Sequence, residues 1–114
     1  KIGDNDVLSA YVAKLVKADL LILLSDIDGL YDKDPSEEDA KLIKRVYCID
    51  DSIREIAMDT ASDLGTGGMK TKINAAEIAM ENGIAMAIVN GNRPDNIYDV
   101  ISGKDVGTLF LRKE

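Results

Sequence analysis

An unbroken apolar run at residues 20–24 limits the folds open to this chain more than any other feature. Five consecutive aliphatic residues without polar alternation predict a strand that is buried on both faces, and such strands are typical of parallel sheets covered by helices. A second run at residues 84–89 predicts another strand, and weaker strand candidates cover residues 42–47 and 107–111. We therefore expect a core built on a largely parallel sheet.

Helical patterns alternate with these strands. Apolar spacing of i, i+3, i+4, i+7 and i+8 predicts a helix near the N-terminus. The residues expected to form its buried face are Leu8, Tyr11, Val12, Leu15 and Val16. Further helices are expected from Ser52, which forms a capping box with Glu55, after the glycine-rich residues 65–68, and from Pro94. The alternation predicts one α/β domain over residues 1–114, a three-layer αβα sandwich with a mainly parallel sheet.

Charge and cysteine content limit the kinds of partner and the cellular compartment that we expect for this chain. The formal net charge of −7 argues against nucleic acid or an anionic membrane as the main partner, because both attract a basic face. No stretch approaches the roughly 20 apolar residues of a membrane span. Cys48 is the single cysteine, and we interpret it as a buried or half-buried structural thiol, since no histidine is present to activate it. These features predict a cytoplasmic globular protein.

The segment GTGGMKTK at residues 65–72 is the strongest candidate for a phosphate site. Glycines ahead of a helix let backbone N–H groups approach an anion, the helix N-terminus adds partial positive charge, and lysines supply full charges. The spacing is not that of a Walker A loop. Taken alone, the segment fits a flexible turn followed by a helix with solvated lysines better than a phosphate site.

Two further polar motifs stand beside predicted elements. The run GDND at residues 3–6 precedes a helix, where its side chains either cap that helix or hold a polar substrate. Ser25 and Asp26 end the first strand, and ligands of open α/β sheets collect at the carboxyl ends of strands. The alternative for this second pair is a turn stabilised by aspartate side chains.

In this order, the three motifs resemble the amino acid kinase family. The blocks that carry the resemblance are GDNDVLSAYVAKLVKADLLILLSDIDGLYDKDP, GTGGMKTKINAAEIAMENGI, NGNRPDNI and VGTLF. The sequences of these segments are most similar to those of the family members that phosphorylate glutamate. Uridylate kinase, aspartokinase and acetylglutamate kinase share the strand that ends in Thr or Ser plus Asp, but they do not usually pair GDND with GTGGMxTK.

The resemblance implies part of the amino acid kinase fold, mainly its C-terminal, ATP-binding half. The N-terminal half, with its own glycine-rich loop, and the PUA domain of many relatives would lie outside the chain. We therefore expect a fragment with little activity of its own. The implied reaction is transfer of the γ-phosphoryl group of ATP, with Mg²⁺, to the γ-carboxylate of L-glutamate. That reaction opens proline synthesis in the cytoplasm, and the resemblance also implies a homo-oligomer with proline as feedback inhibitor.

The resemblance also assigns roles to residues. Asn5 would bind glutamate, Asp6 would orient lysines, and Lys72 would stabilise the transition state. The residues expected to contact ATP are Ser25, Asp26, Thr66, Gly67, Gly68, Met69, Lys70, Thr71 and Lys72. No residue is assigned as a metal ligand. The alternatives are the nucleotide-binding half of another family member, or a nucleotide-binding module without turnover.

Overall fold

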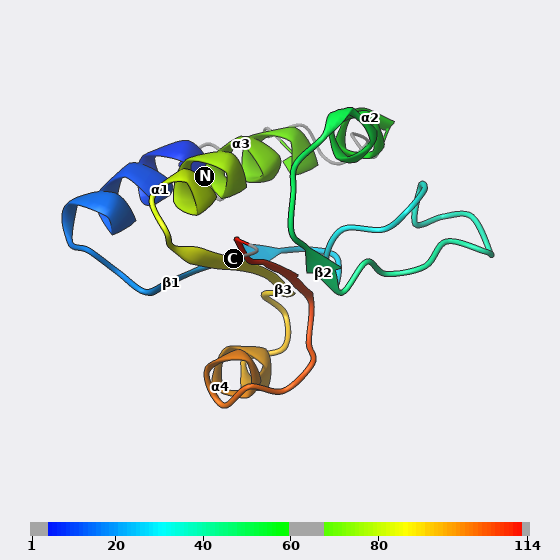
Figure 1. Ribbon diagram of the computed structural model, residues 1–114. Helices are drawn as coiled ribbons and strands as arrows, with labels where there is room; N and C mark the ends of the chain where they lie inside the picture. The colour runs from blue at the N-terminus through cyan, green and yellow to red at the C-terminus, as the bar shows by residue number, and fades with distance from the viewer. Residues whose placement is uncertain (1–4, 60–67, 113–114) are drawn as a thin grey trace.

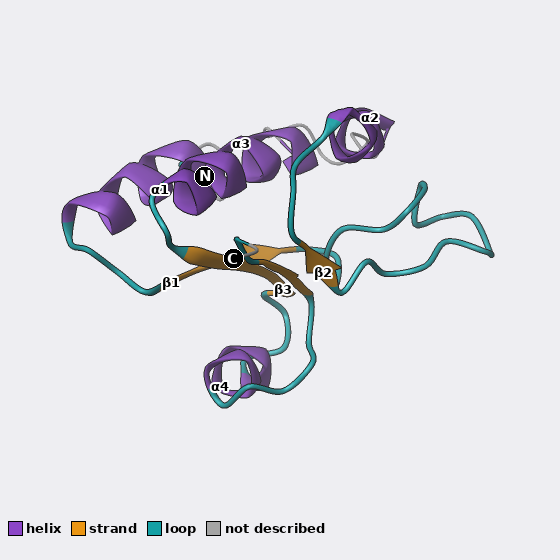
Figure 2. Ribbon diagram, viewed as in Figure 1, coloured by secondary structure: helices purple, strands orange, loops and turns teal. Residues whose placement is uncertain are grey.

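The computed structural model describes residues 5–59 and 68–112, and this part of the chain forms one sheet with helices on both faces (Figures 1 and 2). Helices α1, α2 and α3 cover one face, and α4 lies on the other. The predicted three-layer αβα arrangement is confirmed. The elements in chain order are α1 (Asp6–Leu15), β1 (Leu20–Ser25), β2 (Arg45–Val46), α2 (Asp51–Asp59), α3 (Gly68–Glu81), β3 (Ala85–Asn90), α4 (Asp95–Ile101) and β4 (Thr108–Phe110).

The strand order is β1-β3-β4-β2. Strands β1 and β3 are parallel, with Leu20 opposite Ala85 and Ser25 opposite Asn90, and β2 and β4 are also parallel. Only β3 and β4 run in opposite directions. The sheet of the described residues is therefore mixed but mainly parallel, as the apolar runs predict. Strand β1 stands at one edge, with β3 as its only neighbour in this sheet.

Two similar helix ends bring the functional motifs to one side of the sheet. At the end of α1, the Ala18 N–H donates to the Ala13 carbonyl and the Lys17 N–H to the Lys14 carbonyl, and the residues that end α3 repeat this pattern. Each turn contains a residue with positive φ, Lys17 in one and Gly83 in the other. These are Schellman motifs, which stop a helix and reverse the chain. Each helix is thereby followed at once by the strand on which it packs.

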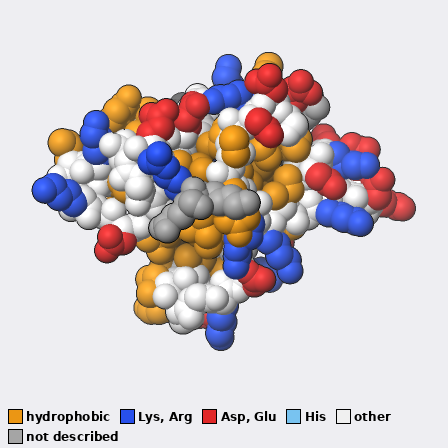
Figure 3. Space-filling view, viewed as in Figure 1, with side chains coloured by type: hydrophobic (Ala, Val, Ile, Leu, Met, Phe, Trp, Pro, Cys, Tyr) orange, Lys and Arg blue, Asp and Glu red, His pale blue; other side chains and the backbone are white. Residues whose placement is uncertain are grey.

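Small side chains form the contact between α1 and α3. The buried residues of α1 are Asp6, Ala10 and Ala13, and three of the seven buried residues of α3 are alanines. The large apolar residues of α1 point the other way, so the predicted buried face is wrong. Leu8, Tyr11, Val12, Leu15 and Val16 are between 48% and 79% exposed. Figure 3 shows hydrophobic side chains at the surface over this helix.

Several local predictions also need correction. The strand expected over residues 42–47 is only Arg45–Val46, and Cys48 is exposed rather than buried. The N-terminal cap of α2 comes from Asp50, not from the predicted capping box: the Ile53 N–H and the Ser52 hydroxyl both donate to Asp50 Oδ1. These bonds lower the pKa of Asp50, because they stabilise its charged form.

A buried hydroxyl fixes the arm that leaves β1. Residues 26–44 extend away from the sheet as two antiparallel stretches that are bridged at Tyr31 and Leu42 (Figure 1). At its base the Leu30 N–H donates to Thr108 Oγ1 at 2.9 Å, and the Thr108 hydroxyl donates to the Ile43 carbonyl at 2.6 Å. Thr108 is fully buried. One side chain of β4 thus satisfies backbone groups from both stretches.

We predict that Thr108→Val lowers the free energy of unfolding of this chain by about 2 kcal/mol, because buried backbone groups lose a hydrogen-bond partner. Thr108→Ser keeps the hydroxyl and should cost less, about 1 kcal/mol for the lost methyl group. Urea denaturation followed by circular dichroism measures both. If Thr108 only fills space, the order reverses, since valine keeps the shape and serine does not.

Candidate active site

The N-termini of two helices and the carboxyl ends of two strands meet along one edge of the sheet, the edge at which these strands end. Because α1 and α3 each turn back over the strand that follows, their N-termini lie at the edge where β1 and β3 end. Ser25 and Asn90 are register partners at those strand ends. Helix N-termini carry partial positive charge, and the carboxyl ends of parallel strands are the usual ligand side of α/β sheets. This edge is therefore the candidate active site.

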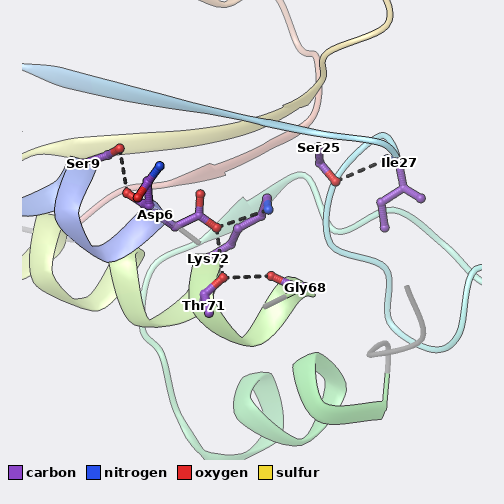
Figure 4. Close-up of polar contacts among 8 residues, drawn as sticks. Asp6, Ser9, Ser25, Ile27, Gly68, Thr71 and Lys72 are labelled. Carbon is purple, nitrogen blue, oxygen red and sulfur yellow. Dashed lines mark hydrogen bonds and ion pairs between the residues drawn. The ribbon is translucent and has the colours of Figure 1, made fainter. Parts of the chain in front are cut away.

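The centre of the site is a buried ion pair between two helices (Figure 4). Lys72 Nζ, on α3, lies 3.2 Å from Asp6 Oδ2, on α1. The Thr71 hydroxyl lies 3.0 Å from the same carboxylate oxygen and 3.1 Å from the Gly68 carbonyl. The side chains of Lys72 and Asp6 are only 6% and 8% exposed. Residues separated by 66 positions in the sequence are thus joined at one oxygen atom.

The lysines of the glycine-rich motif lie in different surroundings. Lys70 is exposed, whereas Lys72 is buried with its ammonium on Asp6. Met69 is 3% exposed and belongs to the hydrophobic core, so the backbone N–H is its group suited to an anion. Thr66 and Gly67 lie outside the described residues. Gly68 begins α3 with a φ of 52°.

Asn5 stands at the start of α1 with an exposed side chain. That side chain makes no capping hydrogen bond to the helix, and Asn5 instead accepts one at its carbonyl from the Ser9 hydroxyl, at 2.9 Å. The carboxylate of Asp6 is turned toward α3. The simple capping interpretation of these two polar side chains is therefore not supported.

Ser25 and Asp26, at the end of β1, lie in different surroundings. Ser25 Oγ accepts a hydrogen bond from the Ile27 N–H at 3.2 Å, which stabilises the turn after β1 (Figure 4). Asp26 is exposed beside it. The turn is thus stabilised by the serine rather than by the aspartate side chains of the alternative interpretation, and contact of Asp26 with a ligand at this edge stays a prediction.

Sequence reasoning missed Asn90 and Asp28. Asn90 Nδ2 donates to Asp28 Oδ1 at 3.1 Å, which ties the end of β3 to the turn after β1. Partial burial, together with the charge and a hydrogen bond of Asp28, raises the pKa of neighbouring Tyr31. The signal was present, because Asn90 follows its apolar run as Ser25 follows the first.

Metal-binding clusters and membrane-spanning helices are two further features relevant to function. Within residues 5–59 and 68–112, no group of three or more His, Cys, Asp or Glu side chains is arranged to hold a metal ion. Among the helices of this described part, each falls short of the length and apolar character needed to cross a bilayer.

Charged side chains of both signs lie over the arm formed by residues 26–44 (Figure 3), where Lys33 pairs with Asp39 at 2.9 Å.

Curated proteins closely similar to this chain carry the name glutamate 5-kinase. The protein from Clostridium tetani is 58% identical over 111 residues, which are 96% of this chain and 42% of that protein. The protein from Clostridium acetobutylicum is 54% identical over 114 residues, 99% of this chain and 43% of that protein. The chain therefore spans less than half the length of these relatives.

Structural and family comparisons agree with this similarity. Uridylate kinase from Archaeoglobus fulgidus superposes with a TM-score of 0.67 at 28% identity, and the match covers 92% of this chain and 46% of that one. A sequence model of the amino acid kinase family matches residues 1–90, well over half of the chain. The fold expected from the three motifs is therefore confirmed, and the chain belongs to the amino acid kinase family.

Proposed function

We propose that this chain is the C-terminal, nucleotide-binding half of a kinase domain that phosphorylates the γ-carboxylate of L-glutamate. The observation that carries the proposal is the buried Lys72–Asp6 pair at the edge where two helix N-termini and two parallel strand ends meet. Such an edge is suited to a polyphosphate, since it combines N–H groups, helix dipoles and a fixed ammonium group. The similarity to proteins named glutamate 5-kinase supports glutamate as the acceptor.

The proposed reaction requires positioning more than acid–base chemistry. The glutamate carboxylate attacks the γ-phosphorus of MgATP in line, the bond to the β-phosphate oxygen breaks, and the products are glutamyl 5-phosphate and ADP. A carboxylate is already a nucleophile, so no general base is needed. The Mg²⁺ arrives on the phosphates of the nucleotide, which is how this ion commonly enters kinase sites.

In this proposal, Lys72 neutralises the charge that spreads over the transferred phosphoryl oxygens. Asp6 holds the ammonium group of Lys72 in place and does not touch the reacting atoms. The exposed Lys70, the backbone N–H groups of Gly68 and Met69, and the strand-end residues would contact the nucleotide. The remaining assignments of the proposal are Ser25, Asp26, Thr66 and Gly67 for ATP, and the exposed Asn5 for glutamate.

The wider setting follows from the same proposal. Glutamyl 5-phosphate formation is the first step of proline synthesis, and we place it in the cytoplasm. The proposal includes a homo-oligomer and feedback inhibition by proline. Its support is the 51–58% identity to the Clostridium and Lactococcus proteins that carry the name glutamate 5-kinase.

Two surfaces support the proposal that the chain is half of a larger domain. Strand β1 is apolar along five of its six residues, yet it stands at the edge of the sheet and only Leu23 is buried. An open, apolar edge strand is a liability that proteins normally cover. The exposed apolar face of α1 belongs to the helix that directly precedes this strand. We assign the N-terminal half of the kinase domain as the cover for both.

We predict that residues 8–25 exchange their backbone amide hydrogens more slowly in a longer polypeptide that includes the N-terminal half than in this chain alone. The added half would pair with β1 and shield α1, which slows exchange. Hydrogen–deuterium exchange with mass spectrometry measures this. Helix α4, on the opposite face, is the internal control and should not change. Equal exchange over residues 8–25 would contradict the domain proposal.

A second prediction concerns turnover. This chain alone should release ADP from ATP and glutamate at less than about 1% of the rate of the longer polypeptide, because in this proposal part of the acceptor site and part of the phosphate clamp lie in the N-terminal half. A coupled ADP-release assay compares the two at equal concentration. Comparable rates would contradict this prediction, since this chain alone would then contain a complete site.

A third prediction separates the two lysines of α3. In the longer enzyme, Lys72→Met should lower kcat by about 10², because a charge-stabilising donor that acts in the transition state is lost, with the KM for ATP changed only a few-fold. Lys70→Met is the matched control on the same helix and should lower kcat far less. Steady-state kinetics on both variants, with circular dichroism to check folding, tests this. A larger kcat loss at Lys70 would reverse the assignment.

A further inference from the structure

Thr71 makes contacts that its assignment as a nucleotide ligand does not explain. Its hydroxyl lies 3.0 Å from Asp6 Oδ2 and 3.1 Å from the Gly68 carbonyl oxygen. Both of these oxygen atoms are acceptors: one is a backbone carbonyl oxygen, and the other is a carboxylate oxygen that also accepts a hydrogen bond from the Lys72 ammonium. A threonine hydroxyl has a single hydrogen, so it donates to one of them at a time. The bond to the charged carboxylate is the stronger one.

The hydroxyl therefore holds the carboxylate from the side of α3. Thr71 and Lys72 are consecutive on the first turns of this helix, and both reach the same oxygen of a residue on α1 (Figure 4). The Gly68 carbonyl, in the i to i−3 position that threonine often bonds within helices, is the alternative acceptor for the same hydrogen, and β-branching limits rotation of the Thr71 side chain. Asp6 thus has a second fixed donor besides the flexible lysine.

We propose that Thr71 is a positioning residue: it fixes the Asp6 carboxylate, which in turn fixes the Lys72 ammonium during phosphoryl transfer. This inference rests on the proposed function. A buried lysine has several rotatable bonds, and one hydrogen bond to a carboxylate that is itself free to turn would not hold the ammonium in one place. The Thr71 hydroxyl removes that freedom. Such precise placement is what a site built on preorganised charge requires.

The test uses the longer enzyme with Thr71→Val and Thr71→Ser. Valine keeps the branched shape and loses the hydroxyl, so kcat should fall about tenfold, the usual size for a lost hydrogen bond to a charged group. The affinity for a non-hydrolysable ATP analogue, measured by calorimetry, should stay within about twofold. Serine keeps the hydroxyl and should restore most of kcat. Ser102→Ala is the matched control, because its hydroxyl bonds the i−3 carbonyl of Asp99 on α4.

A readout that does not depend on turnover completes the test. The unfolding free energies of Thr71→Val, Asp6→Asn and the double variant form a cycle, and the two sites should be coupled. Weaker binding of the ATP analogue to Thr71→Val with kcat unchanged would make Thr71 a nucleotide ligand and overturn the inference. Unchanged kcat in Thr71→Val, no rescue by serine, or zero coupling would overturn it as well. If the unmodified enzyme does not phosphorylate glutamate, the proposed function fails, and Thr71 then has no positioning role in that reaction, whatever the coupling.

Discussion

The arrangement of the candidate site depends on the buried contact between Asp6 and Lys72. Taking two charges out of water costs several kcal/mol per ion, and their mutual attraction repays this only with good geometry and additional hydrogen bonds. Here the additional donor is the Thr71 hydroxyl. A buried pair of this kind is weak evidence for stability. Removal of one partner would nevertheless be costly, because it leaves the other charge buried and uncompensated.

This contact requires α1 and α3 to approach closely, and alanine makes that possible. Ala10 and Ala13 on α1, and Ala75, Ala76 and Ala79 on α3, are at most 5% exposed. Larger side chains between these helices would hold the backbones apart and separate Asp6 from Lys72. The Schellman motifs have a related effect, because they place both helix N-termini at the same edge of the sheet. The ion pair is thus the local result of packing along two whole helices.

The same packing shows what the sequence could and could not predict. Strands β1 and β3 and the convergence of the motifs followed from apolar runs and from the resemblance to known kinases. The buried face of α1 was mispredicted because the periodicity was assigned to the largest apolar residues, such as Leu8 and Leu15, whereas the contact is made by alanines. Strand β2 was overestimated, since its extent depends on pairing with the distant β4. The Asp28–Asn90 bond likewise depends on tertiary pairing of β1 and β3.

In the proposed function, the charge balance at the site calls for cationic groups beyond the described residues. Lys72 is neutralised by Asp6, so the pair as a whole adds little net attraction for a polyphosphate, and the chain carries a net charge of −7. The partial charge of the α3 N-terminus and the exposed Lys70 are modest by comparison with the several negative charges of ATP. The pair is therefore suited to orienting one ammonium group rather than to collecting the nucleotide. Further cationic groups must supply the affinity, and we expect them from the N-terminal half of the domain, which also covers β1 and α1 in our proposal.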